Sequence, residues 1–209
     1  MFDHVTIGAS DRAASERFYD TVLARLGIER TSTGAELTEW DDFGVGQAGP
    51  ERPVTRRLHI GFVAPSREHV DAFWRVGRQA GYESDGAPGP RPQYTEDYYG
   101  SFLLDPDGNS AEALHHDDMR RGGFVDHIWI RVADPDASER FYETIAPYAG
   151  FRVRRATDPP RVQVLGASGS FSLLEGEPSE PIHVAFPAED EAAMVDPDGH
   201  NVELVHRGR

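Results

Sequence analysis

The sequence predicts an α+β protein built from four related βαβββ-like units, the last of them truncated. Two repeats carry this prediction. Residues 104–112 (LDPDGNSAE) recur as residues 195–203 (VDPDGHNVE), and the SERFY segment of residues 15–19 recurs unchanged at residues 138–142. Asp-Pro-Asp-Gly is a strong turn sequence, so each copy of the first repeat predicts a hairpin. Repetition of both segments indicates that one supersecondary unit is used more than once.

The composition is that of a globular protein with one large or two small domains, since 38% of the 209 residues are hydrophobic and 27% are charged. A formal net charge of −15 disfavours nucleic acid and anionic membranes as partners. The chain has neither Cys nor Lys, which excludes disulfides, Cys-ligated metals and lysine-based catalysis. No apolar run approaches a membrane span and the first residues are not a signal peptide, so we expect a cytoplasmic protein.

The first unit is expected in residues 3–47. Its first six residues alternate between apolar and polar, as in a half-buried strand. A helix should follow from an N-cap at Asp11 to Gly27, because apolar residues recur there at every fourth position. Short strands then fill the remainder of the unit, and residues 48–53, rich in Gly and Pro, are expected to form a linker.

The second unit opens with a strand over residues 58–62, followed by a helix capped by Ser66. Residues 84–92 are rich in Gly and Pro and are expected to form a loop. A strand, the Asp-Pro-Asp-Gly turn and a strand carrying Glu112 should complete the unit.

The third unit repeats the first after a polar connector. Its strand is expected over residues 124–130, its helix should begin after Asp134, and Pro147 should kink or stop that helix early. The fourth unit is short: His59 to Glu112 spans 53 positions but His183 to Glu203 spans 20, so 33 residues are missing. The units should pair into two domains, residues 1–116 and 124–209, separated by the connector of residues 117–123.

A histidine lies on the less apolar face of the opening strand in each of the four units, and a glutamate lies on the closing strand of the second and fourth. The expected sets are His4, His59 and Glu112 in the first domain, and His127, His183 and Glu203 in the second. Two neutral imidazoles and one carboxylate form a facial triad that leaves coordination positions open, which suits Fe(II) or Mn(II). An isolated strand histidine is more often structural, and His69, His115, His116, His200 and His206 are interpreted that way. Duplication alone could copy a structural histidine, but it explains the matching glutamates less economically.

These residues and motifs resemble the vicinal oxygen chelate superfamily, which includes glyoxalase I, extradiol dioxygenases and bleomycin-resistance proteins. The resemblance rests on the four histidines, the SERFY helices and the DPDGNSAE and DPDGHNVE segments. It implies paired units forming two cupped mixed β-sheets, each around a divalent metal that chelates adjacent oxygens of a small molecule. The implied ligands are the six residues above, and Zn, Ni or Co are further candidate metals. In the four-ligand variant of glyoxalase I a carboxylate on the closing strand of the first unit is a further ligand; only Gln47 or Glu175 could serve at that place here, and both share a face with large apolar residues, so the three-ligand set fits better.

Other residues are weaker candidates. Tyr94, Tyr98 and Tyr99 precede the Glu112 hairpin and could act as catalytic proton donors or stacking surfaces, although aromatic packing explains them equally well. Arg131 shares a face with His127 and could hold an anionic substrate group or pair with a surface acid. Asp107 and Asp198 are interpreted as turn residues only.

Two functions follow. The first is a metal-dependent dioxygenase, lyase or isomerase acting on a small molecule with vicinal oxygens. The second is a metal-free protein whose acidic cup sequesters a cationic or aromatic antibiotic. The missing helix and strand should leave the apolar face of Ile182, Val184 and Phe186 uncovered unless another subunit or the first domain covers it, and of these two a homodimer is favoured.

Overall fold

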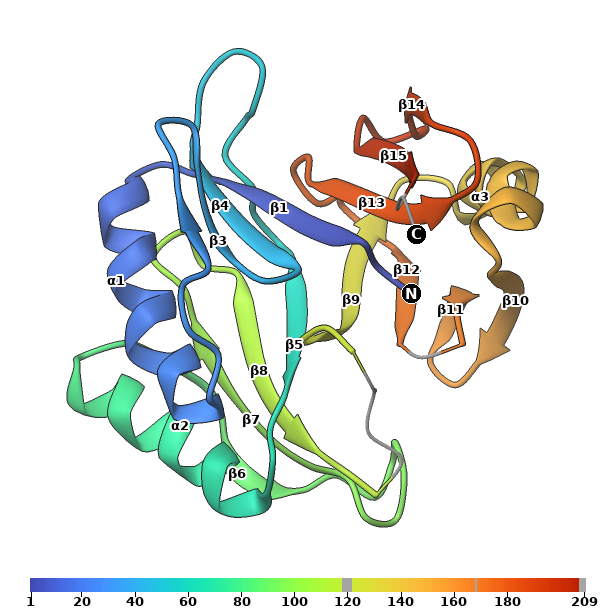
Figure 1. Cartoon of the computed structure of the whole chain (residues 1–209). Coiled ribbons are helices and arrows are strands. Elements are labelled where there is room, and N and C mark those ends of the chain that lie inside the picture. Colours follow the sequence, from blue (N-terminus) through green and yellow to red (C-terminus); the bar gives the residue numbers. More distant parts are fainter. Residues whose placement is uncertain (118–121, 168, 207–209) are drawn as a thin grey trace.

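The computed structural model describes residues 1–117, 122–167 and 169–206, so part of the predicted connector, residues 118–121, lies outside the described residues. Within these ranges the chain forms three α-helices and two mixed β-sheets, and the predicted α+β class is confirmed (Figure 1). Among the described residues no helix is both long enough and apolar enough to cross a membrane.

The elements follow the four predicted units. Unit one contains β1 (His4–Ala9), α1 (Arg12–Leu23), the 3₁₀ helix η1 (Ala24–Leu26), β2 (Ser32–Thr33), β3 (Leu37–Trp40) and β4 (Phe43–Gln47). Unit two contains β5 (His59–Val63), α2 (Arg67–Gln79), β6 (Ser84–Pro90), β7 (Tyr99–Leu104) and β8 (Ser110–His115). Unit three contains β9 (Val125–Val132), α3 (Pro135–Ala149), β10 (Arg152–Thr157), β11 (Pro160–Leu165) and β12 (Ser170–Glu175). Unit four contains β13 (His183–Ala188), β14 (Ala192–Val195) and β15 (Asn201–His206).

Two local predictions were wrong. The expected loop at residues 84–92 contains β6, an edge strand whose pairing with β7 shifts register twice. Its glycines and prolines fit there because an edge strand needs only half of its backbone hydrogen bonds. Pro147 does not shorten α3, which continues to Ala149, because a proline in the last turn removes only one internal hydrogen bond.

Each sheet combines strands from both halves of the chain. One sheet runs β14-β15-β13-β1-β4-β3-β2 and joins units one and four; the other runs β10-β11-β12-β9-β5-β8-β7-β6 and joins units two and three. The joins are the antiparallel pairs β1–β13 and β5–β9. The sheets therefore do not coincide with the halves at residues 1–116 and 124–209.

The apolar faces of the two sheets share one core with the helices. Phe43 of β4 and Phe62 of β5 meet edge to face at 5.2 Å, and both contact the buried ring of Tyr19 from α1. These residues belong to one continuous cluster of buried side chains drawn from all four units. The histidine-bearing faces of the opening strands consequently point away from this core, as the alternation predicted.

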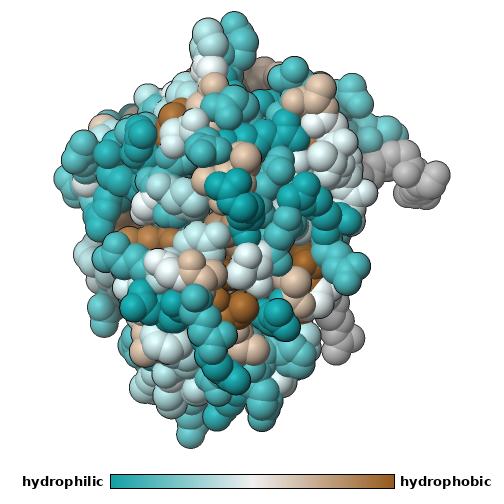
Figure 2. Space-filling model, turned by 90° about the vertical axis from the view of Figure 1, so that its left-hand side faces the viewer, coloured by the Kyte–Doolittle hydropathy of each residue, from teal (hydrophilic) through white to brown (hydrophobic). Residues whose placement is uncertain are grey.

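The apolar face of β13 is covered within the single chain, which is the second of the two expected alternatives, so this face gives no reason to expect a homodimer. Ile182 is 2% exposed, and Val184 and Phe186 are fully buried. Phe186 packs against Phe2 and Phe151, whose ring centroids lie 6.0 and 5.1 Å away. The face that carries α1 and α2 is also largely hydrophilic, with apolar residues in small separate spots (Figure 2). Dimerisation remains a prediction that light scattering tests.

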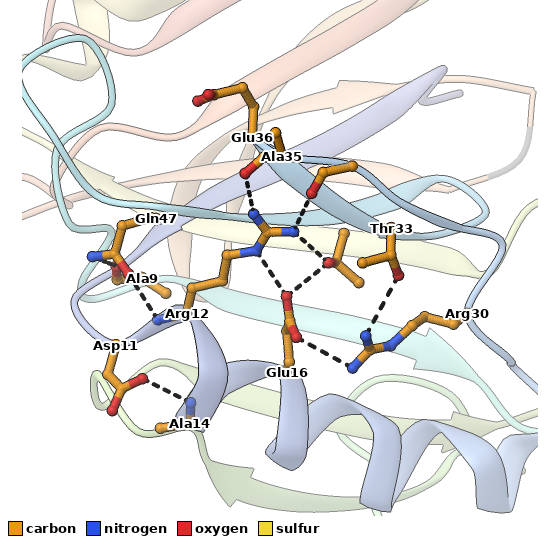
Figure 3. Close-up of polar contacts among 12 residues, drawn as sticks. Ala9, Asp11, Arg12, Ala14, Glu16, Arg30, Thr33, Ala35, Glu36 and Gln47 are labelled. Atoms are coloured by element: carbon orange, nitrogen blue, oxygen red, sulfur yellow. Dashed lines mark hydrogen bonds and ion pairs between the residues drawn. The ribbon is translucent and has the colours of Figure 1, made fainter.

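The first helix and the β2–β3 hairpin are joined by a polar network (Figure 3). Arg12 donates to Glu16 at 2.7 Å and to the backbone carbonyls of Gly34 and Ala35 at 2.8 and 2.6 Å. Gln47 accepts from the Arg12 amide at 3.2 Å and donates to the Ala9 carbonyl at 3.3 Å. The Gln47 side chain is thus committed to the start of α1.

The two Asp-Pro-Asp-Gly turns bind neighbouring units together. Buried Asp105 accepts hydrogen bonds from the amides of Asp107 and Asn109 and from the Tyr19 hydroxyl of unit one, at 2.9, 2.8 and 3.0 Å. Asp107 in turn accepts from the Ser10 amide at 2.9 Å, so it is more than a turn residue. The second copy repeats the arrangement, with Tyr142 donating to Asp196 at 3.1 Å and the Ala133 amide donating to Asp198 at 2.9 Å.

Replacing Tyr19 by Phe should destabilise the protein, because Asp105 stays buried but loses a donor. The expected cost is about 1–3 kcal/mol of the free energy of unfolding, measured by urea denaturation. Tyr148→Phe is the control, since Tyr148 is 64% exposed, and it should change stability by less than about 0.5 kcal/mol. Equal, small effects of the two substitutions would contradict a structural role for the Tyr19–Asp105 bond.

Candidate metal centre

The structure gathers all six predicted ligand residues, but in a different grouping. Site 1 consists of His59, Glu112 and His127, and site 2 consists of His4, His183 and Glu203. The predicted grouping was wrong because β5 pairs with β9 of unit three, and β1 pairs with β13 of unit four. Each histidine therefore meets one from the other half of the chain.

The ligand atoms of site 1 converge closely. The Nε2 atoms of His59 and His127 lie 3.0 Å apart, and they lie 3.1 and 3.3 Å from Oε2 of Glu112. A metal–nitrogen bond of about 2.1 Å places two ligands at right angles about 3.0 Å apart. The three atoms thus match one face of an octahedral coordination shell, as a facial triad requires.

Outer hydrogen bonds fix the orientation of both rings. His127 Nδ1 lies 2.9 Å from a carboxylate oxygen of Asp126, so this nitrogen must be the donor. His59 Nδ1 lies 3.2 Å from the hydroxyl oxygen of Ser110, whose single proton goes to Asp85 at 2.6 Å. His59 Nδ1 is therefore also a donor. In the neutral rings both Nε2 lone pairs face the centre of the site.

Two glycines make room for this arrangement. A Cβ at Gly61 would lie 2.5 Å from the His127 ring, and a Cβ at Gly100 would lie 2.4 Å from Oε1 of Glu112. Even alanine at these positions would displace a ligand side chain. Gly61 also lies at a register shift between β5 and β9, and such irregularities recur beside functional sites.

The charges of the site are tightly coupled. Burial opposes ionisation of Glu112, but hydrogen bonds from His127 and His59 outweigh it and lower the pKa of Glu112 to about 2. Burial likewise disfavours protonated His127, yet hydrogen bonds to Asp126 and Glu112 raise its pKa to about 10. The site thus attracts positive charge, and a proton or a metal ion can supply it.

Residues 1–113 match the model of the Glyoxalase/Bleomycin resistance protein/Dioxygenase superfamily. The chain belongs to this superfamily. No curated protein sequence matches it.

Two solved structures illustrate the relationship. A glyoxalase/bleomycin resistance protein from Albidiferax ferrireducens T118 is 33% identical; the match covers 56% of this chain and 99% of that one, with a TM-score of 0.51. Glyoxalase I from Zea mays is similar over 98% of this chain and 92% of its own, at 15% identity and a TM-score of 0.66. The first resembles half of this chain, and the second shares the fold of the whole.

Neither candidate for a fourth ligand reaches a site. Gln47 is bonded to the start of α1, and Glu175 lies exposed at the end of β12. The pairing registers show which residues correspond to the two glutamates. Ser172 of β12 and Gly44 of β4 occupy the positions in units three and one that Glu112 and Glu203 occupy in units two and four. Ser172 is fully buried. Both sites in this superfamily member therefore have three ligand side chains among the described residues.

The three predicted tyrosines have different positions. Tyr98 is buried and donates its hydroxyl proton to Oε1 of Glu112 at 2.9 Å, which leaves Oε2 facing the histidines. Burial and the Glu112 charge keep the pKa of Tyr98 far above its usual value. Tyr94 lines the cavity above site 1 and is 46% exposed. Tyr99 was wrongly placed in the site: its hydroxyl donates to Asp71 of α2 at 2.9 Å, because adjacent strand residues point to opposite faces.

Site 1 lies at the base of a cavity of about 420 Å³. Its aromatic lining is formed by Tyr94, Tyr98, Phe102 and Trp129. Arg131 is not part of this lining but borders an adjoining hollow of about 330 Å³. The cavity is large enough for a small molecule of the size that protein pockets commonly bind.

Site 2 is more open and less completely supported. Its ligand atoms are similarly close, with His183 Nε2 lying 3.1 Å from both His4 Nε2 and Glu203 Oε2. The Glu203 side chain is 39% exposed, whereas that of Glu112 is 1% exposed. The predicted linker, residues 48–53, folds against this site, and Arg52 and Pro53 line its cavity of about 280 Å³.

The missing residues of unit four explain this asymmetry. In unit two, β6 and the segment after it supply Asp85, Tyr94 and Tyr98 to site 1. Unit four passes directly from β13 to β14 without the counterparts of α2 and β6. Glu203 consequently has no buried tyrosine donor among the described residues, and the wall that would enclose it is absent.

Tyr98→Phe should loosen Glu112, since Oε1 would lose its donor and the carboxylate could rotate. Loss of an outer hydrogen bond to a metal ligand typically lowers metal affinity about 10–100-fold, and competition with a chelator measures this. Tyr99→Phe removes a hydroxyl from the next residue on the opposite face and should leave metal affinity unchanged. A similar loss in both variants would show that the Tyr98–Glu112 bond does not position the ligand.

Proposed function

We propose that site 1 binds a divalent metal ion and that the protein is an enzyme acting on a small molecule with two adjacent oxygen atoms. The observation that carries the proposal is the convergence of three metal-ligating side-chain atoms at site 1. When both histidines are neutral and held as Nδ1 donors, the two Nε2 lone pairs and the Glu112 oxygen face one another at 3.0–3.3 Å. This arrangement is repulsive unless a cation lies among them.

The residues of site 1 suit a metal ion better than a proton. A proton could join only two of the three facing atoms in a linear hydrogen bond, whereas a metal ion uses all of them. A metal held by His59, Glu112 and His127 would supply a Lewis acid for polarising substrate oxygens, with Fe(II) or Mn(II) favoured and Zn, Ni or Co acceptable to the same donors.

Each surrounding residue has a role in this proposal. Asp126 and the Ser110–Asp85 pair orient the two imidazoles, and Tyr98 keeps Glu112 on one oxygen. Trp129 and Phe102 offer flat apolar surfaces beside the open side of the triad. Because Tyr98 gives its proton to Glu112, Tyr94 is the better placed of the two to donate a hydrogen bond to a substrate.

The alternative, a metal-free protein that sequesters a cationic or aromatic ligand, has weaker support. Its aromatic requirement is met by the lining of the cavity. The cavity does not supply the free acidic groups that a cationic ligand needs, because the carboxylates Asp85, Glu112 and Asp126 are hydrogen-bonded to the histidines or to Ser110. The outer part of the cavity instead carries Arg91. A dioxygenase, a lyase or an isomerase would each be compatible with the triad.

Elemental analysis of protein purified without added metal tests the proposal. Near-stoichiometric Fe, Mn, Co, Ni or Zn is expected, and a metal-free protein that still binds an aromatic ligand would favour sequestration instead. Dialysis against a chelator should remove the metal and abolish any metal-dependent turnover, which re-addition of the same ion should restore.

Glu112→Ala should lower the bound metal more than Glu203→Ala, because site 1 is enclosed and site 2 is not. The loss at Glu112 should exceed the about 10–100-fold that an outer partner contributes, since a direct ligand is removed. The two substitutions are matched in chemistry and in position within their units. Equal losses, or a larger loss for Glu203→Ala, would contradict the ranking of the sites.

A further inference from the structure

Arg91 lines the mouth of the site 1 cavity and Arg161 lies beside it, each over an aromatic ring of the cavity lining. The guanidinium carbon of Arg91 lies 5.4 Å from the Phe102 ring centre, and that of Arg161 lies 5.2 Å from the Trp129 ring centre. Tyr94 marks the mouth, because it lines the cavity yet is 46% exposed. Both guanidinium groups are close enough to favour ionisation of Tyr94, although burial and Glu112 together raise its pKa.

Backbone carbonyls, not carboxylates, hold these two arginines in place. Arg91 donates to the carbonyls of Ala87 and Pro90 at 2.8 and 3.0 Å. Arg161 donates to the carbonyls of Asp158 and Pro159 at 3.0 and 2.8 Å. Within the described part of the chain neither forms an ion pair, and the buried Nε of Arg161 has no hydrogen-bond partner.

Arg91 and Arg161 lack counter-ions among the described residues although the chain is acidic. The chain has 36 acidic residues for 21 basic ones, and Arg155, on the opposite face of the same sheet, pairs with both Asp136 and Glu139. At the mouth, burial and repulsion by Arg154 lower the pKa of Arg161. Guanidinium groups that are held in place but have no ion-pair partner can bind an anion well. The entropy of ordering their side chains has already been lost on folding.

The cavity is therefore polarised along its depth. Glu112 and Asp126 lie at the inner end and are engaged with the histidines, and Asp85, which is exposed, accepts the hydrogen bond of Ser110. Arg91 and Arg161 lie toward the outer end. On the side of Trp129 a single indole ring separates the arginine from the histidines, and the ring centres of His59 and Trp129 are 6.2 Å apart.

We propose that the substrate of site 1 carries a carboxylate or phosphate group that Arg91 and Arg161 bind at the cavity mouth. The vicinal oxygens at the other end of the molecule would face His59, Glu112 and His127, and the part between them would lie on Trp129. This assignment of a substrate class rests on the proposed function, but the anion subsite itself does not require a metal ion.

Titration with inorganic phosphate tests the subsite directly. The guanidinium Nε–H resonances of Arg91 and Arg161, assigned from the spectra of Arg91→Gln and Arg161→Gln, should shift saturably in the wild type and in Glu112→Ala. Each single substitution should weaken phosphate binding about tenfold, as expected for loss of a charge-assisted partner. Arg140→Gln is the control, because Arg140 is exposed on α3 and undergoes the same change of charge. No saturable shift, or an equal effect of Arg140→Gln, would overturn the subsite.

A matched pair of ligands tests the substrate class. Metal-loaded protein should bind 3,4-dihydroxybenzoate about tenfold more tightly than its uncharged methyl ester, and Arg91→Gln and Arg161→Gln should remove this preference while leaving ester binding unchanged. Equal affinities in the wild type, or a preference that survives both substitutions, would overturn it. If the subsite binds phosphate but the purified protein holds no metal, the proposed function fails and the anion subsite stands.

Discussion

The antiparallel pairing of β5 with β9, and of β1 with β13, is the constraint on which the sites and the core both depend. It sets Ile60 opposite Ile128 in the core and His59 beside His127 on the other face. The parallel neighbour β8 then brings Glu112 level with Gly61. A shift of one residue would turn the histidines into the core and the isoleucines outward, so the burial of apolar side chains also fixes the positions of the candidate metal-binding atoms.

Buried carboxylates hold the rest of the architecture in place. Asp105 and Asp196 each connect a turn to the tyrosine of the preceding unit's helix, and Glu112 connects a tyrosine to two histidines. A buried carboxylate is tolerated only where donors surround it. The need for donors around a buried carboxylate therefore fixes the contacts between units. It also orients Glu112 within site 1, and such preorganisation favours the binding of a metal or a substrate.

Much of this could be predicted from the sequence, because repeats and alternation specify which face a side chain occupies. All six ligand residues, the turns, the helices and the truncated unit were recognisable in this way. The partner of each opening strand was not, since alternation does not say which strand lies beside which. Tyr99 was misplaced because three aromatic residues were treated as one group although adjacent strand residues diverge. Asp126 was missed, yet the sequence carries a signal for it: an aspartate precedes the histidine in both Asp3-His4 and Asp126-His127.

Because the two triads are built from different residues of one polypeptide, they are free to change independently. In an assembly of two identical chains every codon contributes to both sites, so a mutation that opens one pocket opens its twin. Here the 33 residues absent from unit four affect site 2 alone, and Tyr98 and Arg91 line the cavity of site 1 alone. A single chain can thus specialise one pocket for its ligand while the other loses its enclosure, without any selection to keep them alike.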